Sequence, residues 1–397
     1  MPSVQPPAAL RSRERQLAPF EWYAKMRQEA PVHYDEQRKV WDVFGHEDVD
    51  RVLTDYELFT SDMVSTEAAR FGDDEDHPFF RTMISADPPE HGRLRGFVAD
   101  RFSPGMIREY RPRIEAVAAE FIDRVADANR IDIVDDFAYP LPVTVIAELL
   151  GIPSERRDQF KAWSDTLIAR PIEDTKAAVK ETQTHRKRAK QEMREYFSTL
   201  LDGRADSEDD DLVTLTATTD ELTREEKTGF CTLLLLAGNV TTTNLITNAV
   251  WCFEEQGVTD AVRTGAVDRT QAIEEVLRYR SPVQALRRTT TDAVEIGGQR
   301  IDAGEVITAW IGSANRDSEI FDAAAEFRPE RSPNPHIAFG KGIHYCLGAS
   351  LARIEADIAL KALLDQFEVL SLEESEKTPL KSLYGVKELP CRVESGH

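Results

Sequence analysis

Residues 223–254 carry the longest helical pattern in the chain, with apolar side chains on almost every face. A helix that is apolar all round is buried, so we expect this one at the centre of the fold. Thr223 and Glu226 form a capping box at its start. At helical rise the segment measures roughly 45–50 Å, enough to cross a domain. Its apolar positions are Phe230, Leu233, Leu234, Leu235, Leu236, Val240, Leu245, Ile246, Val250 and Phe253.

A second helical pattern covers residues 347–367, and a shorter one begins at residues 48–53. Short strands are expected around residues 41–43 and within residues 286–298. Residues 383–393 are expected to form a hairpin whose turn touches substrate. Together these patterns predict a mainly helical α+β fold with a minor β-sheet region.

Composition predicts one domain over residues 1–397, because no linker rich in proline, serine or glycine divides the chain. Residues 1–15 are polar and proline-rich, and we expect them to be flexible. They contain no apolar signal region, and no other segment is expected to span a membrane. The four scattered cysteines fit a reducing compartment, so we expect a cytoplasmic protein.

The formal net charge is −22, with 13 lysines against 36 arginines, which makes nucleic acid an unexpected partner. An acidic, lysine-poor surface suits a halophilic protein, in which salt screens self-repulsion; an ordinary acidic cytosolic protein is the alternative. Residues 91–113 reverse the trend, because arginines outnumber acids there. This segment is either a docking surface for an acidic partner or a solvated helix face.

Cys346 stands just before the second helical pattern, between Gly342 and Gly348. Unpaired N–H groups and the positive end of the helix dipole favour a thiolate there, and we expect the glycines to adopt unusual dihedral angles. A thiolate can act as a nucleophile, a zinc ligand or an axial ligand of haem iron. The cysteine spacing argues against zinc, and His344 is too close in sequence to be a nucleophile's base.

The surrounding residues form the pattern Phe-x-x-Gly-x-His-x-Cys-x-Gly, from Phe339 to Gly348, which resembles the haem-binding loop of the cytochrome P-450 superfamily. Every fixed position is occupied. The resemblance implies haem b between the central helix and the helix after the loop, with Cys346 as axial ligand. It is held non-covalently, since Cys-x-x-Cys-His is absent. A buried structural cysteine is the alternative. Within the loop the resemblance assigns cofactor contacts to Phe339, Gly340, His344 and Gly348.

His91 and Arg95 lie four residues apart, on one face of a helix that starts after two prolines. In the resembled family such a pair binds a haem propionate, and Arg287 matches a further propionate ligand by its position. Two solvated bases on a surface are the alternative for the first pair.

The middle of the central helix reads Ala-Gly-Asn-Val-Thr-Thr-Thr, from Ala237 onwards. Glycine and threonine both have low helix propensity, and threonine hydroxyls that donate to carbonyl oxygens of the preceding turn distort a helix. Packing against a neighbour is one explanation. The resemblance instead implies an oxygen-binding groove over the haem, with Ala237 against the cofactor and Thr241 as the alcohol. The acid that usually precedes this alcohol is replaced by Val240, so we expect protons to arrive through water held by Thr241, Thr242 or Asn239.

Glu275 and Arg278 meet on one face of a helix at spacing i, i+3, and the family completes such a pair with an arginine before the haem loop, here Arg331. The resemblance implies a buried network with a structural role. Breaking it would strand a buried charge.

The predicted function is a monooxygenase that hydroxylates a small hydrophobic molecule with O₂ and two electrons from a ferredoxin-type donor. A peroxygenase driven by hydrogen peroxide and a non-catalytic haem protein are the alternatives. The family implies docking of the donor on residues 91–113, joined by Lys341 and Arg353. The pocket residues we expect are all apolar: Leu236, Val283, Leu286 and Leu383.

Overall fold

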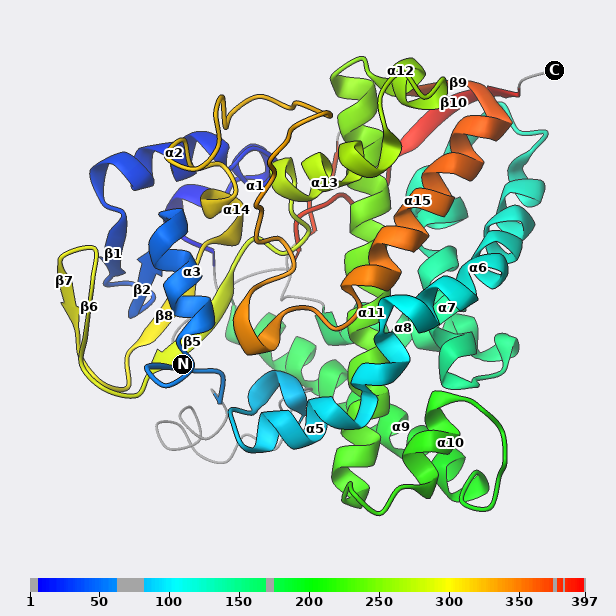
Figure 1. Cartoon of the computed structure of the whole chain (residues 1–397), viewed down its shortest axis with the longest axis horizontal. Coiled ribbons are helices and arrows are strands. Elements are labelled where there is room, and N and C mark those ends of the chain that lie inside the picture. Colours follow the sequence, from blue (N-terminus) through cyan, green and yellow to red (C-terminus); the bar gives the residue numbers. More distant parts are fainter. Residues whose placement is uncertain (1–5, 63–81, 169–174, 374–376, 381–382, 396–397) are drawn as a thin grey trace.

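The computed structural model describes residues 6–62, 82–168, 175–373, 377–380 and 383–395. Helices occupy most of the molecule, and the larger β-sheet lies to one side of them (Figure 1). The longer helices are α2 (Phe20–Glu29), α3 (His46–Thr54), α5 (Glu90–Ala99), α6 (Pro104–Val125), α7 (Pro140–Leu150), α8 (Arg157–Ile168), α9 (Lys176–Gly203), α11 (Arg224–Glu255), α13 (Arg269–Tyr279) and α15 (Ala349–Gln366). The shorter ones are α1 (Arg13–Leu17), α10 (Leu212–Thr218), α12 (Thr259–Arg263) and α14 (Ile311–Ala314).

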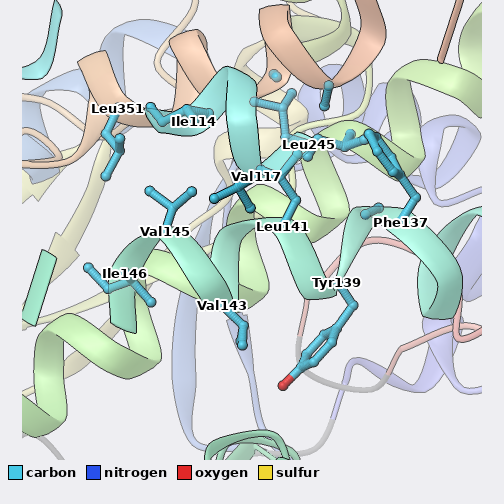
Figure 2. Packing of buried hydrophobic residues seen from close by; sticks show 14 of the residues in the cluster. Ile114, Val117, Phe137, Tyr139, Leu141, Val143, Val145, Ile146, Leu245 and Leu351 are labelled. Atoms are coloured by element: carbon cyan, nitrogen blue, oxygen red, sulfur yellow. The ribbon is translucent and has the colours of Figure 1, made fainter. Parts of the chain in front are cut away.

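Helix α11 is the central element that the sequence predicts. Thr223 and Glu226 form the capping box at its start, and α7, α9, α13 and α15 pack against it. Its length and composition would suit a membrane span, but 78% of its most apolar window is buried inside the fold. Figure 2 shows the core beside it, where side chains of α6 and α7 meet Leu245 of α11 and Leu351 of α15.

A five-stranded sheet has the order β1-β2-β8-β5-β3, with β2 and β8 parallel and the other neighbours antiparallel. Its strands contain the segments 41–43 and 286–290 that the sequence predicts as extended. The smaller sheets have the orders β4-β10-β9 and β6-β7. The strands are β1 (Val32–Asp35), β2 (Val40–Val43), β3 (Phe59–Thr60), β4 (Arg130–Asp132), β5 (Leu286–Thr290), β6 (Val294–Ile296), β7 (Gln299–Ile301), β8 (Val306–Ala309), β9 (Phe367–Leu372) and β10 (Pro390–Ser395).

Two local predictions differ from the structure. Residues 383–393 do not form one hairpin among themselves: β10 pairs with β9 and β4. Val386 instead bridges back to Pro379, and the N–H groups of Leu380 and Lys387 donate to the carbonyl oxygens of Gly385 and Thr378 beside that bridge. The expected flexible segment 1–15 is folded where it is described, because α1 follows a 3₁₀ turn and Leu10 is buried beside Tyr23. In both places the partner is distant in sequence, so local composition carries no sign of it.

Candidate active site

The Cys346 sulfur lies at the start of α15, where the sequence predicts it. The N–H of Gly348 donates to the sulfur, and the N–H of Cys346 donates to the Phe339 carbonyl oxygen at 2.9 Å. Burial raises the pKa of the Cys346 thiol, while the Gly348 N–H and the charges of Arg95 and Arg353 oppose that rise. One N–H donor and two guanidinium charges thus favour a thiolate, while burial opposes it, so a bound metal cation would be needed for a stable thiolate.

Two glycines shape the loop before Cys346. Gly342 has φ +66°, and a Cβ there would lie 3.0 Å from the Leu53 carbonyl oxygen and from Thr54 Cα. Gly340 has φ +71°. Gly348 has an ordinary φ of −85°, so the unusual dihedral angle expected there is absent. Glycine at 342 therefore lets the loop approach α3, whereas Gly348 caps α15.

His91 of α5 and His344 of the loop bring their rings together, with centroids 4.5 Å apart. Both Nε2 atoms are buried, and neither has a hydrogen-bond partner among the described residues. The distance from His344 Nε2 to Asp87 Oδ1 is 3.9 Å, too long for a hydrogen bond. Burial lowers the pKa of His91 to about 4 and also lowers that of His344. Arg95, one turn after His91, donates to the Tyr345 carbonyl oxygen at 2.8 Å.

Arg288, which the sequence did not single out, belongs to this cluster. It is only 7% exposed, burial lowers its pKa to about 10, and its charge in turn lowers the pKa of His344. Arg287, the predicted ligand, is half-buried and lies on the opposite face of β5, because successive strand residues alternate. The sequence shows two adjacent arginines at this position, and either could serve as a propionate ligand. The pairing of β5 with β8 decides which of the two faces inward.

These residues fit a haem group. Two buried imidazoles with unpartnered nitrogens and two partly or wholly buried guanidiniums stand together, and Asp87 is the one carboxylate of the described residues that acts on the pKa of both histidines. One carboxylate does not balance a cluster with two guanidinium charges and two further nitrogens able to donate, and the two propionates of haem would supply the missing negative charge. Iron bound to the half-buried Cys346 sulfur would offset the effect of burial, which raises the pKa of its thiol. Among the described residues, no group of three or more His, Cys, Asp or Glu side chains is placed to hold a metal ion.

The middle of α11 is accessible on one face only. Ala237 is exposed and Thr241 is half-buried, although the helix around them is buried. At ~100° per residue the two lie about 40° apart around the axis. The Thr241 hydroxyl donates to the Ala237 carbonyl oxygen at 2.9 Å, the local back-bonding that the sequence predicts. Val240 is 8% exposed and lies at the edge of this face.

Asn239 and Thr242 point elsewhere. They lie about 200° and 140° from Ala237 around the helix and are 0% and 3% exposed. The Asn239 amide donates to the Tyr139 hydroxyl at 3.3 Å, at the interface with α7. Gly238 belongs to the same interface, since a Cβ on it would lie 3.1 Å from Ile146. Packing therefore explains these three positions, and only Thr241 among the predicted water-holding residues reaches the accessible face.

Glu275, Arg278 and Arg331 come together as one buried network. Arg278 donates to both carboxylate oxygens of Glu275 at 2.7 and 2.8 Å, and Arg331 Nε lies 3.0 Å from Glu275. Arg278 also donates to the carbonyl oxygens of Asn315, Ala324 and Glu326. The network ties α13 to the irregular chain that leads into the Cys346 loop, at a distance from the accessible face of α11.

The predicted pocket residues come from α11, from the segment that leads into β5, from β5 itself and from the segment before β10. Leu236 is 5% exposed on α11, and Val283 and Leu286 are half-buried against the core of the five-stranded sheet. Leu286 lies closest to the loop, since its Cδ1 is 3.9 Å from where a Cβ on Gly340 would be. Leu383 is half-buried before the bridge residue Val386.

Most cations of the predicted docking segment are already paired. Arg111 lies 3.0 Å from Asp357, and Arg353 lies 2.6 Å from Glu274. Arg108 is exposed, and the described part of the chain offers it no salt bridge. The other pairs are Arg93 with Glu90 and Glu226, Arg101 with Asp210, Arg113 with Glu148, and Lys341 with Asp50.

Comparisons with known proteins show the family to which the chain belongs. The family model described as Cytochrome P450 matches residues 269–393. The putative cytochrome P450 YjiB of Bacillus subtilis is 41% identical and covers 97% of both chains. Cytochrome P450 119 of Sulfolobus acidocaldarius is 36% identical over 95% of this chain and 99% of that protein. The structure of CYP109E1 from Bacillus megaterium in complex with testosterone has a TM-score of 0.89 at 40% identity, covering 96% of this chain and 99% of that one.

The identity, the coverage and the shared fold, mainly helical with small sheets, confirm the resemblance that the Cys346 loop indicated. The chain belongs to the cytochrome P450 family of monooxygenases, oxidoreductases that incorporate molecular oxygen.

Proposed function

We propose that this protein binds haem b through the Cys346 thiolate and hydroxylates a hydrophobic organic molecule, with O₂ and two electrons from a ferredoxin-type donor. The observation that carries the proposal is the half-buried Cys346 sulfur, to which the Gly348 N–H donates and whose thiolate the charges of Arg95 and Arg353 favour. The overall reaction consumes O₂, two electrons and two protons, and it converts a C–H group of the substrate into C–OH with release of one water. Haem, when bound, supplies the activation of O₂.

The chain's own residues orient the cofactor and stabilise the thiolate. His91, His344, Arg95 and Arg288 would hold the propionates, with Arg288 in the place first expected for Arg287. The Gly348 N–H and the Arg95 and Arg353 charges favour the thiolate over the thiol. On the other side, Thr241 offers a hydroxyl whose proton is directed to the Ala237 carbonyl oxygen and whose lone pairs can accept a proton from water.

Val240→Asp is expected to raise the amount of product formed per NAD(P)H oxidised with generic substrates, and to lower the release of hydrogen peroxide. A well-placed general acid contributes ~10²–10⁴-fold, and an isopropyl group can neither donate nor relay a proton. Position 240 borders the accessible face of α11, so an aspartate there can reach water held by Thr241. Product, peroxide and NAD(P)H are measured together.

Val240→Asn is the matched control, because it has the shape and polarity of aspartate without the acid. If Val240 instead shapes an apolar pocket, both variants weaken substrate binding and leave the peroxide leak unchanged.

The proposed substrate is a hydrophobic molecule of up to steroid size. CYP109E1, whose structures contain testosterone and corticosterone, is 39–40% identical to this chain in those two complexes. Titration with either steroid should displace water from the iron and shift the absorption spectrum of the haem protein. A steroid that shifts the spectrum but yields no oxidised product would favour a ligand-binding role instead.

The oxidant separates the three candidate activities. Turnover with a ferredoxin, its reductase and NADPH is expected to exceed turnover with hydrogen peroxide alone. The reverse order would identify a peroxygenase, and the absence of product in both would favour a non-catalytic haem protein.

Arg108→Glu is expected to slow reduction by an acidic ferredoxin several-fold and to leave peroxide-driven turnover intact. Exposed charges at the rim of an interface act mainly on the association rate. In molar salt the difference should shrink, because the screening length falls to ~3 Å. Arg392→Glu is the control, because Arg392 is also exposed but lies on β10. Equal loss of both activities in Arg108→Glu would indicate misfolding.

We also place the protein in the cytoplasm, where its four unpaired cysteines are stable. Its net charge of −22 suits a high-salt interior. Activity that is retained or raised in molar salt would support the halophilic assignment.

A further inference from the structure

Glu274 of α13 is a partly buried carboxylate that the proposed mechanism does not use, and it contacts the helix that follows the cysteine loop. Its two oxygens accept hydrogen bonds from Arg353 of α15, at 2.6 Å from Nε and 2.9 Å from Nη2. A bidentate pair of this kind fixes both the place and the orientation of the guanidinium. The next residue, Glu275, binds Arg278 and Arg331 instead, so the two adjacent glutamates hold different arginines.

His336 binds the same carboxylate from the chain that leads into the loop. Its Nε2 lies 3.0 Å from Glu274 Oε2, and its Nδ1 accepts the N–H of Ala338 at 3.3 Å. Because Nδ1 accepts a hydrogen bond, Nε2 carries a proton and donates it to Glu274. Burial tends to raise the pKa of Glu274, but hydrogen bonds from Arg353 and His336 outweigh it and lower that pKa to about 2. Glu274 therefore carries a full negative charge at neutral pH.

Arg353 connects this carboxylate to the cysteine loop. Its guanidinium lies 4.4 Å from the centre of the Phe339 ring, and its Nη1 donates to the Tyr345 hydroxyl at 3.3 Å. Phe339 in turn accepts the N–H of Cys346 at 2.9 Å through its carbonyl oxygen. The charge of Arg353 also favours the Cys346 thiolate. The cation that Glu274 holds thus contacts two residues of the loop that carries the sulfur and acts on the sulfur itself.

Charges beside an axial ligand change the balance between oxidised and reduced iron, because the reduced site carries one more negative charge. A cation near the sulfur favours the reduced site, and an anion that offsets this cation favours the oxidised one. The side chains of Arg353 and Glu274 are only 34% and 31% exposed, so water screens the pair in part. The charge of Glu274 should therefore be felt at the iron.

We propose that Glu274 is a positioning residue that sets the reduction potential of the haem iron, because it holds Arg353 against the cysteine loop and offsets its charge. The inference rests on the proposed function, since it presupposes haem bound through the Cys346 thiolate. In the reduction, ferric iron gains one electron from an external reductant. No bond to Glu274 or Arg353 is made or broken.

The test compares Glu274→Gln, Glu274→Asp and Arg353→Gln with the wild type as substrate-free holoproteins. Each potential is measured by titration with dithionite in the presence of redox mediators, followed by haem absorption. Glutamine keeps the shape of Glu274 without its charge, and aspartate keeps the charge. Asp365→Asn is the matched control, because it removes one negative charge from an exposed pair with Lys361 on α15, about five turns after Cys346.

Glu274→Gln is expected to raise the ratio of ferrous to ferric iron at a fixed potential by ~10-fold, which is ~59 mV for one electron. Arg353→Gln should lower that ratio several-fold. Glu274→Asp should restore most of the wild-type potential, and Asp365→Asn should leave it unchanged. The opposite signs separate a charge effect from damage to the loop, which would shift the potential of Glu274→Gln and Arg353→Gln in the same direction.

An unchanged potential in Glu274→Gln overturns the inference, as does a shift of the same sign in Arg353→Gln. A shift in Glu274→Asp as large as that in Glu274→Gln assigns the effect to packing and overturns it too. If Glu274→Gln does not retain haem, Arg353→Gln decides, and an unchanged potential there is the contradicting result. A wild type whose reduced carbonyl complex lacks the band of thiolate ligation overturns the proposed function instead.

Discussion

Replacement of Cys346 by histidine is expected to abolish monooxygenase activity and the spectrum of thiolate ligation, while some haem remains bound. The cluster of His91, His344, Arg95 and Arg288 is untouched by the change, so the propionate contacts should persist. An imidazole is neutral and donates less electron density to iron than a thiolate, and it is that density which favours cleavage of the O–O bond. The reduced carbonyl complex should therefore lose the absorption band of a thiolate-ligated haem.

Cys391→Ala is the control for this experiment, because Cys391 is fully buried on β10 and belongs to no part of the site. It should keep both the band and the activity, with a modest loss of stability from a lost buried side chain. If Cys346→His keeps the thiolate band, another residue is the ligand and the proposed site is wrong.

Glu275→Gln is expected to destabilise the fold by about 3–5 kcal/mol, the usual cost of removing one partner from a buried ion pair. Glu275 and Arg278 are both completely buried, and Arg331 is nearly so. Glutamine keeps the size of the side chain but leaves two guanidinium charges without a counter-charge. Urea unfolding of the holoprotein, followed by far-UV circular dichroism and by haem absorption, measures the loss.

The control is Glu326→Gln, which breaks an exposed pair with Arg328 at 2.8 Å. Surface pairs contribute roughly 0–1 kcal/mol, so this variant should unfold almost as the wild type does. Because Glu275 also accepts the N–H of Arg328 at 2.7 Å, we expect the haem signal of Glu275→Gln to be lost no later than its helical signal. If Glu275→Gln and Glu326→Gln are equally stable, the network does not have the structural role assigned to it.

The sequence alone was sufficient wherever the decisive contact is local or the chemistry allows few residue types. The apolar surface all round residues 223–254 has no stable place except the interior, and α11 lies there. The capping box joins Thr223 and Glu226, which lie within one helical turn, so the sequence shows it directly. The loop around Cys346 was recognisable because a positive φ and a close backbone approach at Gly342 admit no other residue.

Other features were decided only when distant segments met. The choice between Arg287 and Arg288 depends on which face of β5 turns inward, and that follows from its pairing with β8. The sequence alone could not tell whether Asn239 or Thr241 faces the accessible side of α11. The structure decides this, because Asn239 contacts Tyr139 at the interface with α7. The basic segment looked like an open docking surface, but Asp357, Glu148 and Asp210 neutralise most of it from other elements.

The physical reason for this division is the range of the interactions. Helix periodicity, capping and glycine dihedral angles act within a few residues, so the order of amino acids encodes them directly. Charge pairing, strand register and the exposure of a given helix face depend on elements brought together by folding, and no local pattern specifies their partners. Local sequence therefore determined the central helix and the cysteine loop of this protein, and the tertiary structure decided which arginine of β5 faces inward and which threonine of α11 reaches the accessible face.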